Sequence, residues 1–349
     1  MIVGIMNRKE KYRGFKPLTT VDGSLIFYSK GYLWKITKGN MTRITRLFEP
    51  SFKDKFRLAI RFFRREPKLA VAVSDDEILI SFHKKIQLVN LKTEETKLIQ
   101  SCREGFSDPL NICNESSEWL AVWGDYGDNK NLDFVNVYGL TSNHKVETLY
   151  KFGPGTIRHI HNIVPCLEGG YYLLTGDNEQ KAGIYKASAD FKIVRSVLVG
   201  NQQYRAVVGF DTQNGLLFAT DSVNAPNHIY VLNNDGKIRL VGDLNGSCIY
   251  GVTVEGKYYF STTVEPDETR KGLLSWISYK KGKGILSNYV QVVCVSDRFE
   301  VSEILRLKKD FWPMKLMQYG AVQFPRGQCK NLWIYPIAVE RVDGCAERL

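Results

Sequence analysis

The sequence predicts an all-β fold, a single β-propeller of four-stranded blades, with seven blades favoured and six as the alternative. The first observation is composition: 18 Tyr, 18 Phe and 6 Trp beside 29 Gly favour strands and tight turns over helices. The second is that strand-like segments recur in the same internal order about every 40 to 50 residues, the spacing of propeller blades. No linker or low-complexity stretch divides the chain, so residues 1–349 are expected to form one domain.

Each repeat begins with an apolar strand and a turn or polar loop. A strand such as "FVNVYGL", "AGIYKAS" or "NHIYVLN" follows, and after an Asn, Asp or Gly turn the repeat ends with a strand such as "VETLYKF". Seven clusters follow this order, although the first two are poorly marked. Their ranges are 22–48, 77–99, 118–152, 158–199, 205–242, 248–294 and 301–341. The best candidate for a helix is 52–65, whose aromatic residues also suit a strand.

The formal net charge of +11 is compatible with an acidic partner, but the Lys and Arg residues are dispersed and mostly suit a solvated surface. We expect no nucleic-acid partner, because no nucleic-acid-binding motif occurs. We also expect no membrane span, because no apolar run approaches the roughly 18 residues that one needs. The seven cysteines are scattered without a C-x-x-C pair and the N-terminus lacks the pattern of a secretory signal, so we expect a cytoplasmic protein. The oligomeric state is left open.

Several motifs resemble those of BNR-repeat, sialidase-like propeller proteins assigned as glycosyl hydrolases of bacterial exopolysaccharide or capsule loci. The segments that carry the resemblance are "WGDYGD" (123–128), "GTIRHIHNI" (155–163), "LLTGDNEQKAGIYKASADF" (173–191), "QQYRAVVGF" (202–210), "FATDSVNAPNHIY" (218–230) and "QYGAVQFPRG" (318–327). The Asp-box of such families, S-x-D-x-G-x-T-W, survives only as Ser188 and Asp190 of "SADFKIVR". The resemblance implies the propeller fold and an activity on glycans.

His159 and His161, two of the five histidines in the chain, stand one residue apart in an apolar stretch. In an extended strand both imidazoles share a face, and Arg158 takes the other. Because loops that enter the inner strands of a propeller line its channel, polar residues at the starts of blades are expected to meet there. The expected catalytic residues are His159, His161, Tyr204, Asp177 and Asp221. The expected substrate-binding residues are Trp123, Asp125, Tyr126, Arg158, Arg205, Asn227 and Arg326, and Asp128 and Tyr319 belong to the same wider set.

These residue types suit an acidic sugar, because arginines bind carboxylates and aromatic rings cover sugar faces. Elimination would use His159 or His161 as base, Tyr204 as acid and Arg158 or Arg205 as clamp. Hydrolysis would use Asp125, Asp177 or Asp221 with Tyr204. The sequence leaves both reactions open. We therefore predict a carbohydrate-active protein of bacterial polysaccharide metabolism that cleaves glycosidic bonds in an acidic polysaccharide or oligosaccharide.

Structural roles compete with each of these functions. A strand histidine is often a hydrogen-bonded packing residue, Asp177 and Asp221 suit turns, Arg205 suits an ion pair between blades, and Arg326 suits an outward turn. The alternative function is a non-catalytic propeller that binds a glycan or a protein during polysaccharide synthesis. No cofactor is expected, since nucleotide and dinucleotide motifs are missing. A divalent metal at His159 and His161 with a nearby Asp is the one exception considered.

Overall fold

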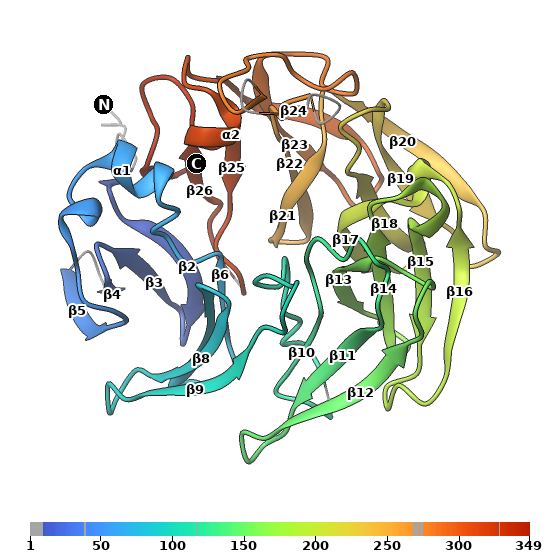
Figure 1. Ribbon diagram of the computed structural model, residues 1–349, viewed down its shortest axis with the longest axis horizontal. Helices are drawn as coiled ribbons and strands as arrows, with labels where there is room; N and C mark the ends of the chain where they lie inside the picture. Colours follow the sequence, from blue (N-terminus) through green and yellow to red (C-terminus); the bar gives the residue numbers. More distant parts are fainter. Residues whose placement is uncertain (1–9, 38–39, 117, 268–271, 273–274, 328) are drawn as a thin grey trace, which may run out of the picture.

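The computed structural model describes residues 10–37, 40–116, 118–267, 272, 275–327 and 329–349. Within these residues the chain is almost entirely β-structure, and seven antiparallel sheets radiate around a common centre (Figure 1). The helices of the described residues are short: α1 (Arg57–Phe62), α2 (Met314–Met317) and the 3-10 turns η1 (Phe52–Asp54), η2 (Glu179–Lys181) and η3 (Gln202–Tyr204). The expected all-β propeller with seven blades is therefore confirmed, and the helix candidate 52–65 is partly helical.

The strands run in chain order within the first six sheets, from the centre outwards. The first sheet contains β2 (Lys16–Val21), β3 (Ser24–Ser29), β4 (Tyr32–Thr37) and β5 (Asn40–Arg46), and the second contains β6 (Leu69–Ala72), β7 (Glu77–Phe82), β8 (Lys85–Asn90) and β9 (Thr96–Ser101). The third contains β10 (Ala121–Gly124), β11 (Val135–Leu140) and β12 (Val146–Phe152), and the fourth contains β13 (His159–Pro165), β14 (Tyr171–Gly176), β15 (Gly183–Ala187) and β16 (Val194–Val199). The fifth contains β17 (Ala206–Thr212), β18 (Gly215–Thr220), β19 (Asn227–Leu232) and β20 (Ile238–Leu244), and the sixth contains β21 (Cys248–Val254), β22 (Lys257–Thr262), β23 (Tyr289–Val295) and β24 (Val301–Lys308).

The seventh sheet closes the ring with both ends of the chain. It contains β25 (Ala321–Gln323), β26 (Trp333–Ile337), β27 (Cys345–Arg348) and, as its outermost strand, β1 (Lys11–Arg13). Strand β1 pairs antiparallel with β27, with Lys11 opposite Glu347. Backbone bonds between Arg326 and the residues Leu18 and Thr20 join the seventh sheet to the first. The closure ties the two ends of the chain together by hydrogen bonds that only the folded ring provides.

Three of the expected blade boundaries need correction. The segment 301–308 is strand β24, which pairs with β23 and completes the sixth sheet instead of starting the seventh. The first and second sheets each begin earlier than expected, with β2 at Lys16 and β6 at Leu69. β2 contains Lys16 and Pro17, and the four-residue β6 follows Pro67 and Lys68, so their apolar pattern is weak in the sequence.

Packing between neighbouring sheets explains why the inner strands are held firmly. Val137 of the third sheet and Ile163 and Leu173 of the fourth belong to one buried cluster, and each of their side chains is at most 3% exposed. Gly124 ends β10 where a side chain would overlap Ile160 of β13, so the two inner strands approach closely at this point. Burial of such alternating apolar side chains is the main stabilising contribution in a sheet stack. The close approach brings the polar residues that follow Gly124 next to the start of β13.

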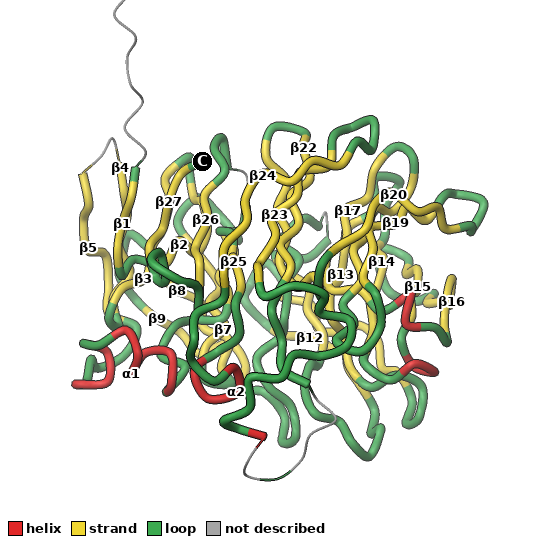
Figure 2. The backbone as a smooth tube through the Cα atoms, turned by 90° about the horizontal axis from the view of Figure 1, so that it is seen from above, coloured by secondary structure: helices red, strands yellow, loops and turns green. Residues whose placement is uncertain are grey.

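Loops on one face of the ring carry most of the expected site residues. The segments that lead into the inner strands and the segments that follow the second strands lie on this face, because strands alternate in direction within each sheet. The segments that bear α1 and α2 lead into β6 and β25, and Figure 2 shows both helices along one edge of the ring. The degenerate Asp-box lies elsewhere, in the turn between β15 and β16, where Ser188 Oγ donates to Asp190. Among the described residues, no helix is both long and apolar enough to cross a membrane.

Candidate functional site

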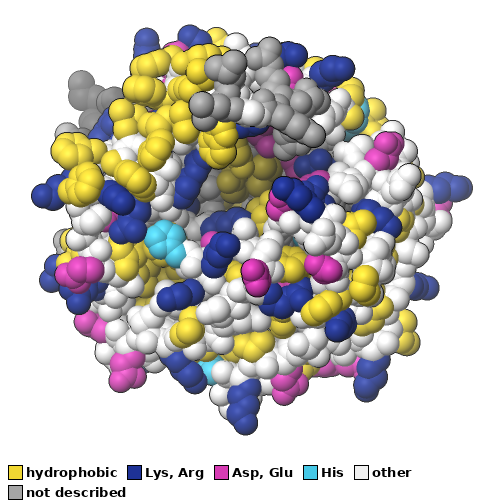
Figure 3. Space-filling view, in the orientation of Figure 1, with side chains coloured by type: hydrophobic (Ala, Val, Ile, Leu, Met, Phe, Trp, Pro, Cys, Tyr) yellow, Lys and Arg dark blue, Asp and Glu magenta, His cyan; other side chains and the backbone are white. Residues whose placement is uncertain are grey.

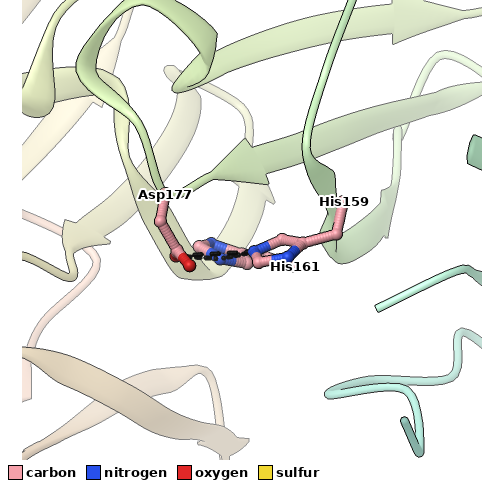
Figure 4. Close-up of side chains that lie close together, drawn as sticks. All are labelled: His159, His161 and Asp177. Carbon is pink, nitrogen blue, oxygen red and sulfur yellow. Dashed lines mark hydrogen bonds and ion pairs between the residues drawn. The ribbon is translucent and has the colours of Figure 1, made fainter. Parts of the chain in front are cut away.

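The centre of the candidate site is formed by His159, His161 and Asp177 (Figure 4). His159 begins the inner strand β13, and Asp177 directly follows the neighbouring strand β14. His161 occupies a bulge of β13, because the register skips from Ile160 to Asn162. A bulge redirects a side chain that a regular pleat would place differently. The two imidazole centroids lie 4.9 Å apart, so the expected shared side for the two rings is confirmed.

Backbone carbonyls fix the tautomers of both histidines. His159 Nδ1 lies 2.6 Å from the carbonyl oxygen of Gly127, and His161 Nδ1 lies 2.9 Å from that of Ala206. A carbonyl oxygen only accepts, so each Nδ1 carries the proton and donates it. In the neutral form of each ring, Nε2 is then an acceptor with a free lone pair.

Three acceptor atoms consequently converge on one point. The Nε2 atoms of His159 and His161 lie 2.9 Å apart, and Asp177 Oδ1 lies 3.1 Å from the Nε2 of His161 and 3.4 Å from that of His159. Lone pairs at this spacing repel unless a proton or a metal ion lies between them. Ligands about 2.1 Å from an ion and at right angles to each other are about 3 Å apart, which is close to the observed spacing. The set therefore fits either one shared proton or one divalent cation.

The Asp177 carboxylate is held in its ionised form. Burial alone would raise the pKa of its carboxyl group, but the hydrogen bonds with His159 and His161 and the charge of Arg205 outweigh that effect and hold the pKa well below its usual range. Arg205 Nη2 lies 3.1 Å from Asp177 Oδ1, and Arg158 Nη1 lies 3.5 Å from Oδ2. Asp177 remains 27% exposed, so it is the member of the three that reaches the channel mouth.

The imidazoles themselves are buried, each residue being 2% exposed. Burial lowers the pKa of His159, and the hydrogen bond with Asp177 opposes that effect. Tyr126 packs against both rings, with its centroid 4.6 Å from that of His159. Burial, together with the charges of Asp177 and Asp221, raises the pKa of the Tyr126 phenol, which therefore keeps its proton at neutral pH. Two imidazoles, a carboxylate and a phenol thus lie side by side.

Arg205 connects this centre to Asp221. It begins the approach to β17, and its Nη2 atom lies 3.3 Å from Asp221 Oδ2 as well as close to Asp177. Asp221 follows β18, one residue beyond Thr220, which pairs with Ala206. The ion pair between blades that we considered for Arg205 is therefore present.

Arg158 also pairs with two carboxylates, Asp128 and Asp177, but its side chain is 22% exposed, against 11% for Arg205. Its Nη2 atom donates to Asp128 at 2.5 Å, and its Nη1 atom lies 3.3 Å from Asn178 Oδ1. Asp128 itself is largely exposed and also pairs with Lys130. The Arg158 side chain therefore lies at the surface of the mouth, beside the exposed edge of Asp177.

Trp123, Asp125 and Asn227, which we expected to contact the substrate, have structural roles instead. Trp123 is 2% exposed within the core between the second and third sheets, and its indole N–H donates to Gln100. Asp125 accepts bonds from Arg103, from the backbone N–H of Asn136 and from the Tyr138 hydroxyl.

Asn227 uses its amide to order a loop, with bonds to Thr220, Ser222, Ala225 and Gly284. Trp123, Asp125 and Asn227 therefore use their polar groups in bonds within the protein. Their predicted contact with a substrate is corrected to a structural role.

Tyr204 and Arg326 lie outside the centre. Tyr204 ends the 3-10 turn η3, and among the described contacts its hydroxyl makes no hydrogen bond to the two histidines or to Asp177. Arg326 lines a cavity in the channel and donates to Asn111 Oδ1, whose amide in turn donates to the backbone oxygen of His161. Tyr319 is partly buried near Tyr126 and Tyr250, and desolvation raises its pKa well above the ordinary value.

Sequence reasoning missed two lysines and one asparagine of the channel: Lys16, Lys68 and Asn111. Lys68 places its Nζ atom 4.4 Å from the centre of the Tyr126 ring. The sequence marks the two lysines only by their position at the start of an apolar stretch, Lys16 in "KPL" and Lys68 in "KLAVAV". That pattern is common at strand ends and does not by itself indicate a channel.

No protein-family model matches the chain, and no curated protein matches it by sequence. Solved structures do match its fold. An oligogalacturonate lyase from Vibrio parahaemolyticus is similar over 97% of this chain and 90% of its own, with a TM-score of 0.55 and 8% identity. The WD40 β-propeller domain of Doa1 is similar over 97% of both chains, with a TM-score of 0.54 and 8% identity.

The extracellular domain of a one component system from B. thetaiotaomicron covers 98% of this chain and 39% of its own, with a TM-score of 0.53 and 10% identity. At these identities the similarities support the propeller class and not a particular activity. Membership of the sialidase-like family stays a prediction.

Proposed function

We propose that this protein is a carbohydrate-active propeller of bacterial polysaccharide metabolism that cleaves an acidic glycan by elimination at the mouth of its channel. The observation that carries the proposal is the convergence of two imidazole lone pairs on an ionised Asp177, with Arg158 at the rim. A base, a group that stabilises the protonated base and a cation for a carboxylate are the parts that elimination requires. The name of one fold neighbour, an oligogalacturonate lyase, agrees with a substrate of this class.

In the proposed reaction, Arg158 binds the carboxylate of a uronate sugar. The proton on the adjacent carbon passes to an imidazole Nε2, and its electron pair forms a carbon–carbon double bond as the bond to the leaving sugar oxygen breaks. That oxygen takes the phenolic proton of Tyr126, whose raised pKa keeps it protonated beforehand. The imidazolium, stabilised by Asp177, then returns the proton to Tyr126, so the protein ends as it began.

Elimination is favoured over hydrolysis by the state of the carboxylates. Hydrolysis in most families needs one protonated carboxylic acid beside a second carboxylate. The pKa of Asp177 is held well below its usual range, and Asp221 is paired with Arg205. Neither group is placed to supply a proton to a leaving oxygen.

The burial of the imidazoles favours a second candidate, a non-catalytic propeller that binds the glycan through a divalent cation. His159 and His161 are each 2% exposed, which restricts direct approach by a substrate carbon. Two histidines and a carboxylate form a ligand set for ions such as manganese or zinc, and such an ion would attract a glycan carboxylate. In this candidate the same three residues hold a metal and move no proton.

The deciding experiment incubates the protein with a panel of polyuronates and follows new reducing ends and the absorbance of unsaturated uronates. Both signals together support elimination, and reducing ends without unsaturation indicate hydrolysis. For the base, we expect His161→Gln to lower the rate by about 100-fold or more. His228→Gln is the matched control, because His228 of β19 pairs with Asp243 of β20, away from the site. Glycan binding and metal binding without any product would establish the second candidate.

The proposal includes a cytoplasmic setting, because all seven cysteines are free thiols. An acidic polysaccharide or oligosaccharide is the proposed partner.

A further inference from the structure

A cavity inside the channel is lined by three cationic side chains from different parts of the ring. Lys16 comes from the start of β2, Lys68 precedes β6, and Arg326 follows β25. Tyr250 and Gln323 line the same cavity. Figure 3 shows the hollow at the centre of the ring, with Lys and Arg side chains gathered around it. The ring closure therefore brings three cationic residues to the lining of one cavity.

Each of the three cations is bonded to a neutral oxygen. Lys16 Nζ donates to the carbonyl of Pro67 at 2.8 Å, Lys68 Nζ donates to the carbonyl of Asp108 at 2.7 Å, and Arg326 donates to the side-chain oxygen of Asn111. Within the described part of the chain, none of the three forms an ion pair. Lys16 is only 5% exposed, so solvent does little to screen its charge. Lys68 and Arg326 are partly buried. Buried charges in proteins are normally paired, so three cations without an ion pair around one cavity favour an anion as its occupant.

The nearest carboxylates are committed to other partners. Glu66 accepts a bond from Arg57 at 2.7 Å and another from the Tyr335 hydroxyl. The Asp108 carboxylate accepts from the Ser81 hydroxyl and from the backbone N–H of Lys84. Burial accordingly lowers the pKa of Lys16 and that of Lys68 to about 8. Desolvation lowers both values, and the neighbouring carboxylates of Glu66 and Asp108 offset that effect only in part.

The cavity adjoins the candidate site. Lys68 Nζ lies over the Tyr126 ring, which packs against His159. On the other side, Asn111 joins Arg326 to the backbone oxygen of His161. We propose that this cavity, lined by Lys16, Lys68 and Arg326, is a second subsite that binds a small oxyanion. Its occupant is the carboxylate of a further acidic sugar, an assignment that rests on the proposed function.

The test uses isothermal titration of the full-length protein with sodium glucuronate, sodium sulfate and sodium phosphate at constant ionic strength. Glucose is the neutral control. We expect anion binding that weakens at least tenfold in Lys68→Gln and in Arg326→Gln. Lys97→Gln and Arg195→Gln change the same residue types on the outer strands β9 and β16, and both should bind as the wild type does. Preference for glucuronate supports the sugar carboxylate, whereas equal or tighter binding of sulfate or phosphate reassigns the site to those oxyanions.

The proposal is overturned if none of the three anions binds the wild-type protein above chloride, or if the surface variants lose binding as strongly as the cavity variants. Lys68→Arg keeps the charge and should retain most of the affinity, which separates loss of charge from loss of folding. Anion binding should also persist in His161→Gln. If His161→Gln still binds the anion and the wild type cleaves no glycan, the oxyanion site is supported and the proposed elimination is refuted.

Discussion

Gly176 lies directly against the imidazole of His161, so close that a methyl group at position 176 would overlap the ring. Gly176 also pairs with His159 in the register of β13 and β14. One glycine therefore fixes the space into which the bulged histidine fits. The exact placement of the His161 ring is a property of two strands and not of its own local sequence.

Gly176→Ala should displace the His161 ring and disrupt the three-acceptor centre. Because overpacking of a filled site costs about 1–3 kcal/mol, we expect a loss of unfolding free energy in that range. Cleavage or metal binding should fall together with it. Gly200→Ala is the control, since Gly200 has open space around it, although its positive φ adds some strain. Urea denaturation and titration with Mn²⁺ measure both effects, and an unchanged affinity for Mn²⁺ and unchanged cleavage in Gly176→Ala would contradict the prediction.

Asp177→Asn should change how the free energy of unfolding depends on pH in the acidic range. The folded pKa of Asp177 lies below its unfolded value, so its contribution is present above about pH 4 and is lost as the pH falls through the folded pKa. Hydrogen bonds to a charged group contribute about 1.5–3 kcal/mol. We expect the variant to be less stable by an amount of that order at pH 7 and to differ less from the wild type at pH 3. Denaturation at several pH values tests this, and a constant difference would count against it.

Lys16→Met should remove a dependence of stability on alkaline pH. The folded pKa of Lys16 is about 8 against 10.5 for the exposed side chain. The unfolded chain therefore binds more protons between these values, and stability rises with pH across that window. A shift of this size corresponds to at most about 3.4 kcal/mol. In chloride buffers, we expect the wild type to gain stability relative to Lys16→Met from pH 7 to 9.5. A gain of equal size in both proteins would refute the assignment.

Arg61 should be essential for closing the ring. It is 1% exposed within α1, yet it pairs with Asp310 and Asp343 near the seventh sheet and donates to the backbone of Met317. Removal of one partner from a buried ion pair costs about 3–5 kcal/mol. Arg61→Leu should lose stability in that range. Arg64→Gln alters an exposed arginine of the same segment and should lose far less, so similar losses in both would argue against a closing role.

Part of the candidate site could be anticipated from the residues alone. The repeat predicted that blade starts meet at the channel, and the structure brings Arg205 and Asp221 to the histidine pair. The same rule failed for Trp123 and Asp125. The rule takes no account of side-chain direction: Trp123 packs in the core between two sheets, and the Asp125 carboxylate bonds to Asn136 and Tyr138 of β11.

The sequence by itself determined the architecture, because the alternation of apolar residues and the recurrence of turns are local properties that repeat along the chain. It also predicted that His159 and His161 share a side, but the two rings meet through a bulge at His161, which the strand period does not predict. Only the tertiary structure decided what these residues face. The tautomer of each imidazole depends on a carbonyl from another segment, at Gly127 and at Ala206. The charge around Lys16 likewise depends on which carboxylates remain unpaired after the ring closes, and this follows from contacts between residues far apart in the chain.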